Sequence, residues 1–183
     1  TFNGEIYNHR EIRKRIGNEF SEIRWRGNSD TETLLESISL LGLERTLDEI
    51  RGMFAFALWD RLENSLTLAR DRMGEKPLYY GWQNGVFLFG SELKALKAHP
   101  AFDGEIDRNA LAAYLRHNCV PCPLSIYKDI KKLSAGCLLK FDNGTKLITT
   151  TSYWSTVEQA VSSRRMAVDE GQDHLEGLLS SAV

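Results

Sequence analysis

Residues 53–59 read MFAFALW, a stretch that is apolar throughout and predicts a strand buried on both of its faces. A polar turn over residues 60–64 follows it, and residues 65–70 predict the strand that returns. Residues 77–89 then contain Asn84-Gly85, a dipeptide typical of a tight hairpin turn. Consecutive hairpins of this kind predict antiparallel sheet and argue against a βαβ fold.

Helical and extended patterns precede this β region. Residues 1–7 predict a strand that enters a turn. Residues 9–16 predict a short amphipathic helix, which the dipeptide at residues 17–18, glycine and asparagine, is expected to stop. Residues 20–26 alternate between apolar and polar side chains and predict a further strand.

Ser29 and Glu32 have the spacing of a capping box, which predicts that a helix begins there and ends at Gly42. Its predicted inward face consists of Leu34, Leu35, Ile38 and Leu41. Asp30 falls in the first turn of this helix, where free backbone N–H groups and the helix dipole stabilise a carboxylate. We expect its charge to be available to a bound cation, although a plain helix-end carboxylate has the same pattern.

The second half of the chain is less regular. A short helical pattern runs over residues 92–98, and Asp107 is a suitable N-cap for a helix that ends near residue 117. The predicted inward face of that helix consists of Leu111, Tyr114 and Leu115. A proline-rich loop at residues 118–126 and two short strands, residues 136–141 and 146–150, follow. Helices on either side of antiparallel strands place the chain in the α+β class.

Composition narrows the functional classes. The 183 residues can form a full-sized domain with its own core. With 23 basic and 25 acidic side chains the formal net charge is −2, so neither nucleic acid nor an anionic membrane is an expected partner. No apolar run approaches the roughly 20 residues that span a bilayer. Three cysteines, an odd number, predict free thiols in the reducing cytoplasm.

The stretch FNGEIYNH at residues 2–9 is the most informative part of the sequence about function. Asn3 offers a side-chain amide, Gly4 a backbone N–H and Glu5 a carboxylate, side by side. Such a set can bind an oxyanion and a substrate ammonium group together. The dipeptide Asn3-Gly4 by itself is also typical of a plain turn.

Four segments in this order resemble class II glutamine amidotransferase domains of the glutamine-hydrolysing asparagine synthetase type; they are residues 2–9, 29–32, 51–60, and 69–80 with 89–96. The run EKPLYY at residues 75–80 looks more like asparagine synthetases than relatives that make purine precursors or amino sugars. The resemblance covers roughly residues 1–155. It implies a four-layer αββα sandwich of antiparallel sheets, the fold of N-terminal-nucleophile hydrolases.

The resemblance also implies a mechanism. In the family a cysteine thiolate at the mature N-terminus attacks the side-chain amide of glutamine, with its own α-amine as the base. Asn3 and Gly4 match the donors to the oxyanion, and Glu5 and Asp30 match the contacts to the α-ammonium group of glutamine. The released ammonia passes to a second domain, which activates aspartate with ATP and Mg²⁺.

The chain departs from this pattern at both ends. It begins at Thr1, has no cysteine before Cys119, and lacks a match to the family's arginine for the glutamine carboxylate. We therefore expect residues 1–155 to be a partial amidotransferase domain, incomplete at the N-terminus, inactive alone and without a cofactor of its own. Residues 156–183 are expected to be a linker and the first helix of a missing ATP-dependent synthetase domain. Whether the protein forms a homodimer stays open on the sequence alone.

Several alternatives stay open on the sequence alone. One is a non-catalytic module that binds glutamine or a partner; another is the domain of a related sugar-amidating or β-lactam-forming enzyme. Thr1 is a conceivable nucleophile.

Cys119-x-x-Cys122 has a zinc-ligand spacing, with His117 and Cys137 as further ligands, but free thiols and no metal are favoured. Residues 70–72 (Arg-Asp-Arg) are expected to form a structural salt-bridge corner rather than a catalytic cluster.

Overall fold

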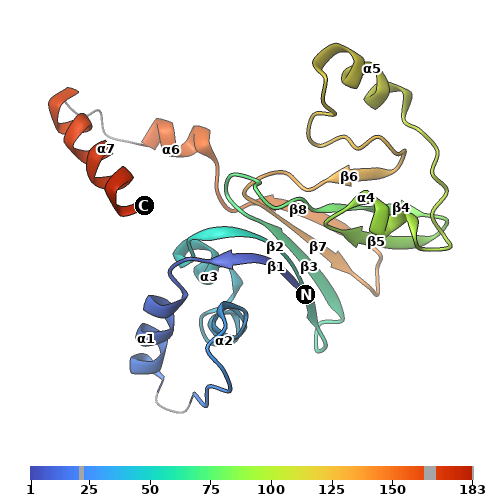
Figure 1. Ribbon diagram of the computed structural model, residues 1–183. Coiled ribbons are helices and arrows are strands. Elements are labelled where there is room, and N and C mark those ends of the chain that lie inside the picture. The colour runs from blue at the N-terminus through green and yellow to red at the C-terminus, as the bar shows by residue number, and fades with distance from the viewer. Residues whose placement is uncertain (21–22, 163–167, 183) are drawn as a thin grey trace.

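The computed structural model describes residues 1–20, 23–162 and 168–182, and it contains two antiparallel sheets (Figure 1). The larger sheet has the strand order β1-β2-β3-β7-β8 and the smaller one the order β5-β4-β6. The strands are β1 (Phe2–Ile6), β2 (Gly52–Asp60), β3 (Ser65–Arg70), β4 (Tyr79–Gln83), β5 (Val86–Gly90), β6 (Ile130–Lys132), β7 (Cys137–Asp142) and β8 (Ile148–Ser152).

The helices lie outside the two sheets (Figure 1). Three of them, α1 (His9–Glu19), α2 (Asp30–Leu41) and α3 (Leu43–Glu49), gather on the outer side of the five-stranded sheet. The short helix α4 (Leu93–Lys97) follows β5, and α5 (Arg108–His117) projects beyond the smaller sheet. The last helices, α6 (Thr156–Ser162) and α7 (Val168–Ala182), extend away from the layered body.

Apolar side chains form three clusters, and each cluster lies between two adjacent layers of the four-layer structure. The first, around Leu34, Leu47 and Phe54, lies between α1–α3 and the larger sheet. The second lies between the two sheets, and the third joins the smaller sheet to α4 through Leu88 and Leu96. The αββα arrangement therefore agrees with the expected fold.

Strand β2 shows why its sequence is apolar on both faces. Phe54 and Phe56 pack toward the helices, whereas Ala55 and Ala57 pack toward the second sheet. All four are less than 9% exposed. Because successive side chains of a strand point to opposite faces, a strand between two apolar layers needs an apolar residue at every position.

The predicted turns and caps are confirmed. The Ser29 hydroxyl accepts a hydrogen bond from the Glu32 N–H at 3.2 Å, as expected for the N-cap of α2. Asp107 caps α5 by accepting from the Asn109 N–H at 2.8 Å. The residues at 84 and 85 both have positive φ, which suits the two-residue turn between β4 and β5.

The segment between α1 and α2 corrects two predictions. Helix α1 does not stop at residues 17–18 but continues to Glu19, because Ile16 is fully buried and its carbonyl accepts from the Phe20 N–H. No strand forms over residue 20 or residues 23–26; residues 21–22 lie outside the described residues. The backbone N–H groups of Arg26 and Gly27 bond the Glu32 carboxylate and not a sheet neighbour.

Two predicted helix faces are also corrected. On α5 the side chains of Leu111, Tyr114 and Leu115 are 40%, 47% and 74% exposed, and the small Ala110 is the buried contact. On α2, Leu35 is exposed, while Thr33 and Ser37 are buried. An amphipathic pattern marks a face that can be buried, but the tertiary fold decides whether another element covers it.

The C-terminal segment is more helical than its polarity predicts. The expected linker and first helix over residues 156–183 contain α6 over residues 156–162 and α7 from Val168. Residues 163–167 lie outside the described residues. None of the described helices combines the length and the apolar character needed to cross a membrane.

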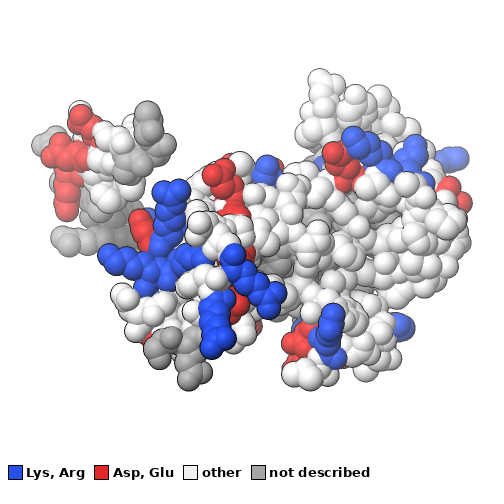
Figure 2. Space-filling view, turned by 60° about the horizontal axis from the view of Figure 1, so that its bottom comes forward, with Lys and Arg blue, Asp and Glu red and all other residues white. Residues whose placement is uncertain are grey.

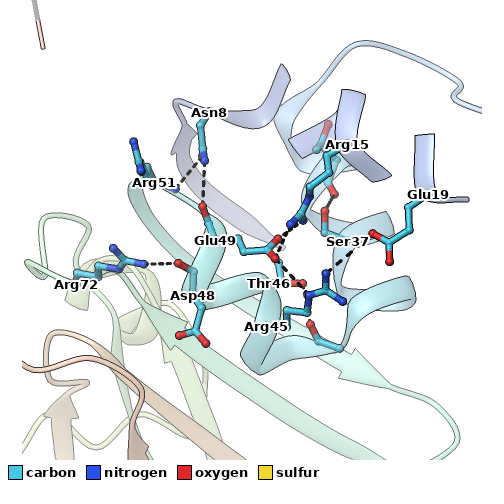
Figure 3. A network of polar contacts seen from close by, with 12 residues as sticks. Asn8, Arg15, Glu19, Ser37, Arg45, Thr46, Asp48, Glu49, Arg51 and Arg72 are labelled. Atoms are coloured by element: carbon cyan, nitrogen blue, oxygen red, sulfur yellow. Dashed lines mark hydrogen bonds and ion pairs between the residues drawn. The ribbon is translucent and has the colours of Figure 1, made fainter. Parts of the chain in front are cut away.

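A polar network ties the helical layer to β1 and β2 (Figure 3). The Arg15 guanidinium pairs with the Glu49 carboxylate, with one N–O distance of 2.6 Å, and this contact joins α1 to α3. The Asn8 side chain donates to the Glu49 carbonyl and accepts from the Arg51 N–H. Arg15 is therefore exposed but held against α3 by its contact with Glu49.

Arg13 of α1 also has defined partners. Its guanidinium lies 3.8 Å from the centre of the Trp25 ring and 3.6 Å from a Glu32 carboxylate oxygen. Arg10 and Lys14 of the same helix are exposed. Figure 2 shows blue Lys and Arg side chains gathered on part of this face, with red Asp and Glu side chains beside them.

Candidate active site

The residues Asn3, Gly4 and Glu5 lie on β1, an edge strand of the larger sheet. Thr1 and Ala57 exchange two backbone hydrogen bonds, of 2.8 and 2.9 Å. Hydrogen-bonded pairs alternate in an antiparallel ladder, so the N–H groups of residues 2, 4 and 6 point away from β2. The Gly4 N–H is thus directed to the open edge of the sheet, where a ligand can reach it.

A glycine is required at position 4 because of the neighbouring strand. Gly4 has φ of 156°, and a Cβ built there would lie 2.2 Å from the Met53 carbonyl oxygen and 2.7 Å from the Phe54 Cα. The contact that excludes a side chain therefore belongs to β2.

The side chain of Asn3 points toward the second sheet. Phe2 and Ile6 pack into the helix-side core, so Asn3 and Glu5 occupy the opposite face of β1. The Asn3 amide nitrogen donates to the Ser91 hydroxyl at 3.0 Å, just beyond the end of β5. Beside this contact lies a cavity of about 220 Å³ lined in part by Asn3, Ala57, Leu78, Phe89 and Ser91.

Asp30 reaches the same edge of β1 from the first turn of α2. One carboxylate oxygen accepts from the Ile6 N–H at 3.0 Å, and the other accepts from the Thr31 N–H at 2.7 Å. These two bonds hold the Asp30 carboxylate next to Ile6, which follows Glu5 in β1. The structure therefore brings all four predicted site residues to one strand edge, and Glu5 remains exposed to solvent.

A larger hollow lies elsewhere. It measures about 1230 Å³ and is lined by residues 19–20, 23–24, 26–27 and 29 and by the outer side of α2, including Leu35 and Glu36. Neither Asn3 nor Glu5 nor Asp30 lines it. Because the polar groups that suit an oxyanion converge at β1, we place the candidate site there and not in the larger hollow.

The Arg70-Asp71-Arg72 segment is structural, but it is not the expected salt-bridge corner. Asp71 is completely buried, and its carboxylate accepts from the N–H groups of Phe54, Met73, Glu75 and Lys76 at 2.9–3.2 Å. Arg70 donates to three backbone carbonyls, and Arg72 donates to those of Leu47 and Asp48. Backbone groups, not opposite side-chain charges, satisfy these ions.

The cysteines lie apart from the candidate site. The Cys122 Sγ is 3.6 Å from the Ser134 Oγ, and burial raises the pKa of the Cys137 thiol. Within residues 1–20, 23–162 and 168–182, no group of three or more histidine, cysteine or acidic side chains is arranged to hold a metal ion. None of the three cysteines lines the cavity beside Asn3.

Comparison with known proteins identifies the family to which this sequence belongs. Residues 1–154 match the family described as a glutamine amidotransferase domain. The chain belongs to this family. Asparagine synthetase (glutamine-hydrolyzing) 3 of Bacillus subtilis is 38% identical over 160 residues, which are 84% of this chain and 24% of that protein. Its paralogue asparagine synthetase (glutamine-hydrolyzing) 1 is 39% identical over 135 residues, 74% of this chain and 21% of that protein.

Solved structures of other amidotransferases share the fold. This amidotransferase domain superimposes on the allosteric regulatory enzyme of purine biosynthesis with a TM-score of 0.58, at 16% identity, over 85% of this chain and 28% of that one. The value for the glutamine phosphoribosylpyrophosphate amidotransferase of B. subtilis is 0.57. The domain spans between a fifth and a third of the length of the curated relatives.

Ser91 is a site residue that pattern analysis did not single out. It lies in the matched segment at residues 89–96, and its hydroxyl contacts Asn3 across 88 positions of sequence. The sequence signal is only that a polar residue follows the apolar strand β5. That signal does not identify a partner on another sheet.

Proposed function

We propose that this domain hydrolyses glutamine to glutamate and supplies ammonia within a glutamine-hydrolysing asparagine synthetase. The observation that carries the proposal is the strand β1, which carries the Asn3 amide, the outward Gly4 N–H and Glu5, and whose Ile6 N–H holds the Asp30 carboxylate. Donors and carboxylates so placed match a substrate with a polarisable amide at one end and an ammonium group at the other.

The donors act on the charge that develops during reaction. A thiolate attacks the side-chain amide carbon of glutamine, and the carbonyl oxygen becomes an oxyanion. The Asn3 Nδ2 and the Gly4 N–H donate to this oxygen, and one such donor contributes about 3 kcal/mol to the transition state. Collapse of the tetrahedral intermediate breaks the C–N bond, the protonated nitrogen leaves as ammonia, and water hydrolyses the thioester to glutamate.

Glu5 and Asp30 are proposed to bind the α-ammonium group of glutamine. Asp30 is held by two backbone N–H groups, which leaves further lone pairs of its carboxylate for a cation. Glu5 is exposed on the strand beside it. Two negative charges at this position favour a cationic substrate group and orient the amide of glutamine toward Asn3.

The attacking thiol is proposed to come from outside the cavity lining, because no cysteine lines the space beside Asn3. The resemblance assigns that role to an N-terminal cysteine. Aspartate is the proposed ammonia acceptor, activated by ATP and Mg²⁺ in a synthetase domain that continues from residues 156–183. The three cysteines are free thiols, which supports a cytoplasmic setting.

Kinetics of the full-length protein that carries this domain test the residue roles. Asp30→Ala should raise the glutamine KM by tenfold or more with little change in kcat, since a ground-state contact is lost. Asn3→Ala should lower kcat by about 100-fold with little change in KM. Asp48→Ala, on the far helix α3, serves as the control. Unchanged glutamine affinity in the Asp30 variant would contradict its assigned role.

A second candidate function is a module that binds glutamine without hydrolysing it. The absence of a cysteine from the cavity lining favours this reading for the 183-residue chain. The chain by itself should release no ammonia from glutamine in a coupled assay, even where calorimetry detects binding. Ammonia release that survives removal of all three cysteines but not Thr1→Ala would identify threonine as the nucleophile instead.

A further inference from the structure

The hydrogen bond between Asn3 and Ser91 joins the two sheets at the candidate site. Asn3 lies on β1 of the larger sheet, and Ser91 directly follows β5 of the smaller one. The donor is the Asn3 Nδ2 and the acceptor is the Ser91 Oγ, 3.0 Å apart. Both residues line the cavity of about 220 Å³, so the contact lies at its wall.

This contact determines which way the Asn3 amide faces. A primary amide carries two N–H groups on one nitrogen, and its carbonyl oxygen lies on the other side. When one N–H is given to Ser91, the plane of the amide is defined and its second N–H is left for another acceptor. Without Ser91 the amide can rotate, and its oxygen would repel an oxyanion from the same position.

Ser91 is itself held in place by packing. Gly90 ends β5 by pairing with Tyr79, and a Cβ on Gly90 would lie 2.8 Å from a methyl group of Leu96. Leu96 is 2% exposed and belongs to the cluster between α4 and the smaller sheet. The strand end and the close approach of α4 therefore place the Ser91 hydroxyl, rather than leave it on a mobile loop.

We propose that Ser91 is a positioning residue for the oxyanion donor Asn3, so that the second sheet orients the amide of the first. The inference rests on the proposed glutaminase function. Ser91 touches no reacting atom; it acts by holding the amide nitrogen toward the substrate oxygen. Positioning errors of this kind lower the rate of the chemical step more than they lower affinity.

A double-mutant cycle in the full-length protein tests the coupling. Ser91→Ala should lower kcat for glutamine hydrolysis about tenfold, with the glutamine KM changed less than twofold. In the Asn3→Ala background the same change should have no further effect, because Ser91 acts only through Asn3. Ser91→Thr keeps a hydroxyl and should restore most of the rate. Ser39→Ala, at an exposed position of α2, is the control.

Nuclear magnetic resonance of the 183-residue chain gives a readout independent of activity. The Asn3 Nδ2 proton that is bonded to Ser91 should exchange slowly with solvent, and Ser91→Ala should shift its resonance and speed its exchange. Equal rate losses in the wild-type and Asn3→Ala backgrounds, or unchanged Asn3 signals, would overturn the positioning role. If Asn3→Ala leaves glutaminase activity intact, the proposed function fails instead, and the Asn3 signals still report whether the bond forms.

Discussion

At the scale of single residues, buried charge in this domain is satisfied by backbone and not by opposite side chains. Asp71 accepts four backbone N–H groups from β2 and the 73–76 turn. Removing a buried acceptor leaves its donors without partners, and each such donor costs about 1–3 kcal/mol. The Tyr153 hydroxyl adds a bond to the Arg70 carbonyl beside it, and burial raises the pKa of that phenol.

Asp71→Ala should therefore be among the most damaging single changes in the domain. We expect a loss of about 4 kcal/mol of unfolding free energy, measured by urea titration, because several buried N–H groups lose their acceptor. Asp48→Ala is the control, since Asp48 accepts the hydrogen bond from Arg72 through its backbone carbonyl, which the substitution keeps. Equal stability of the two variants would show that the 73–76 turn does not depend on the Asp71 carboxylate.

At the scale of elements, α1 continues through a glycine that its sequence suggests as a stop. Nothing lies within 4 Å of a Cβ built on Gly17. Alanine favours the interior of a helix by about 1 kcal/mol over glycine. Gly17→Ala should raise the unfolding free energy by roughly 0.5–1 kcal/mol in a thermal or urea titration. Destabilisation would mean that α1 is strained at this position.

The contact between α1 and α3 predicts a dependence on pH. The hydrogen bond from Arg15, followed by its charge, lowers the pKa of Glu49 from its usual value of 4.5. A carboxyl whose pKa falls on folding stabilises the protein above pH 4.5, and that contribution is lost as the pH falls through the lowered pKa.

Glu49→Gln tests this dependence. The variant should be less stable than the parent at pH 7, and the difference should shrink as the pH falls below about 4.5. Urea midpoints measured from pH 3 to pH 7 provide the test. Glu11→Gln, at an exposed position of α1, is the matched control for the loss of one negative charge.

At the scale of the whole molecule, the site lies at an edge between layers. The Gly4 N–H, the Asn3 amide and the Asp30 carboxylate come from β1 and α2, and Ser91 comes from the second sheet. An open strand edge exposes backbone donors that a substrate can use. The packing of α2 and the two sheets places these groups near one another, and Asn3 and Ser91 line the same cavity.

Local patterns in the sequence determined much of this protein. The apolar run of β2, the Asn84-Gly85 turn, and the caps at Ser29 and Asp107 each express a preference that a few neighbouring residues decide. Motif resemblance led to the family and to the four candidate residues. These features depend on backbone conformation and side-chain spacing within one element, which a linear pattern records directly.

Only the tertiary structure decided how the site is put together. The contact of Asn3 with Ser91 spans 88 positions, that of Asp30 with Ile6 spans 24, and the direction of the Gly4 N–H depends on the register with β2. The exposed apolar faces of α2 and α5 were mispredicted for the same reason. A sequence pattern shows which groups can pair or be buried, whereas the packing of distant elements determines which of them meet.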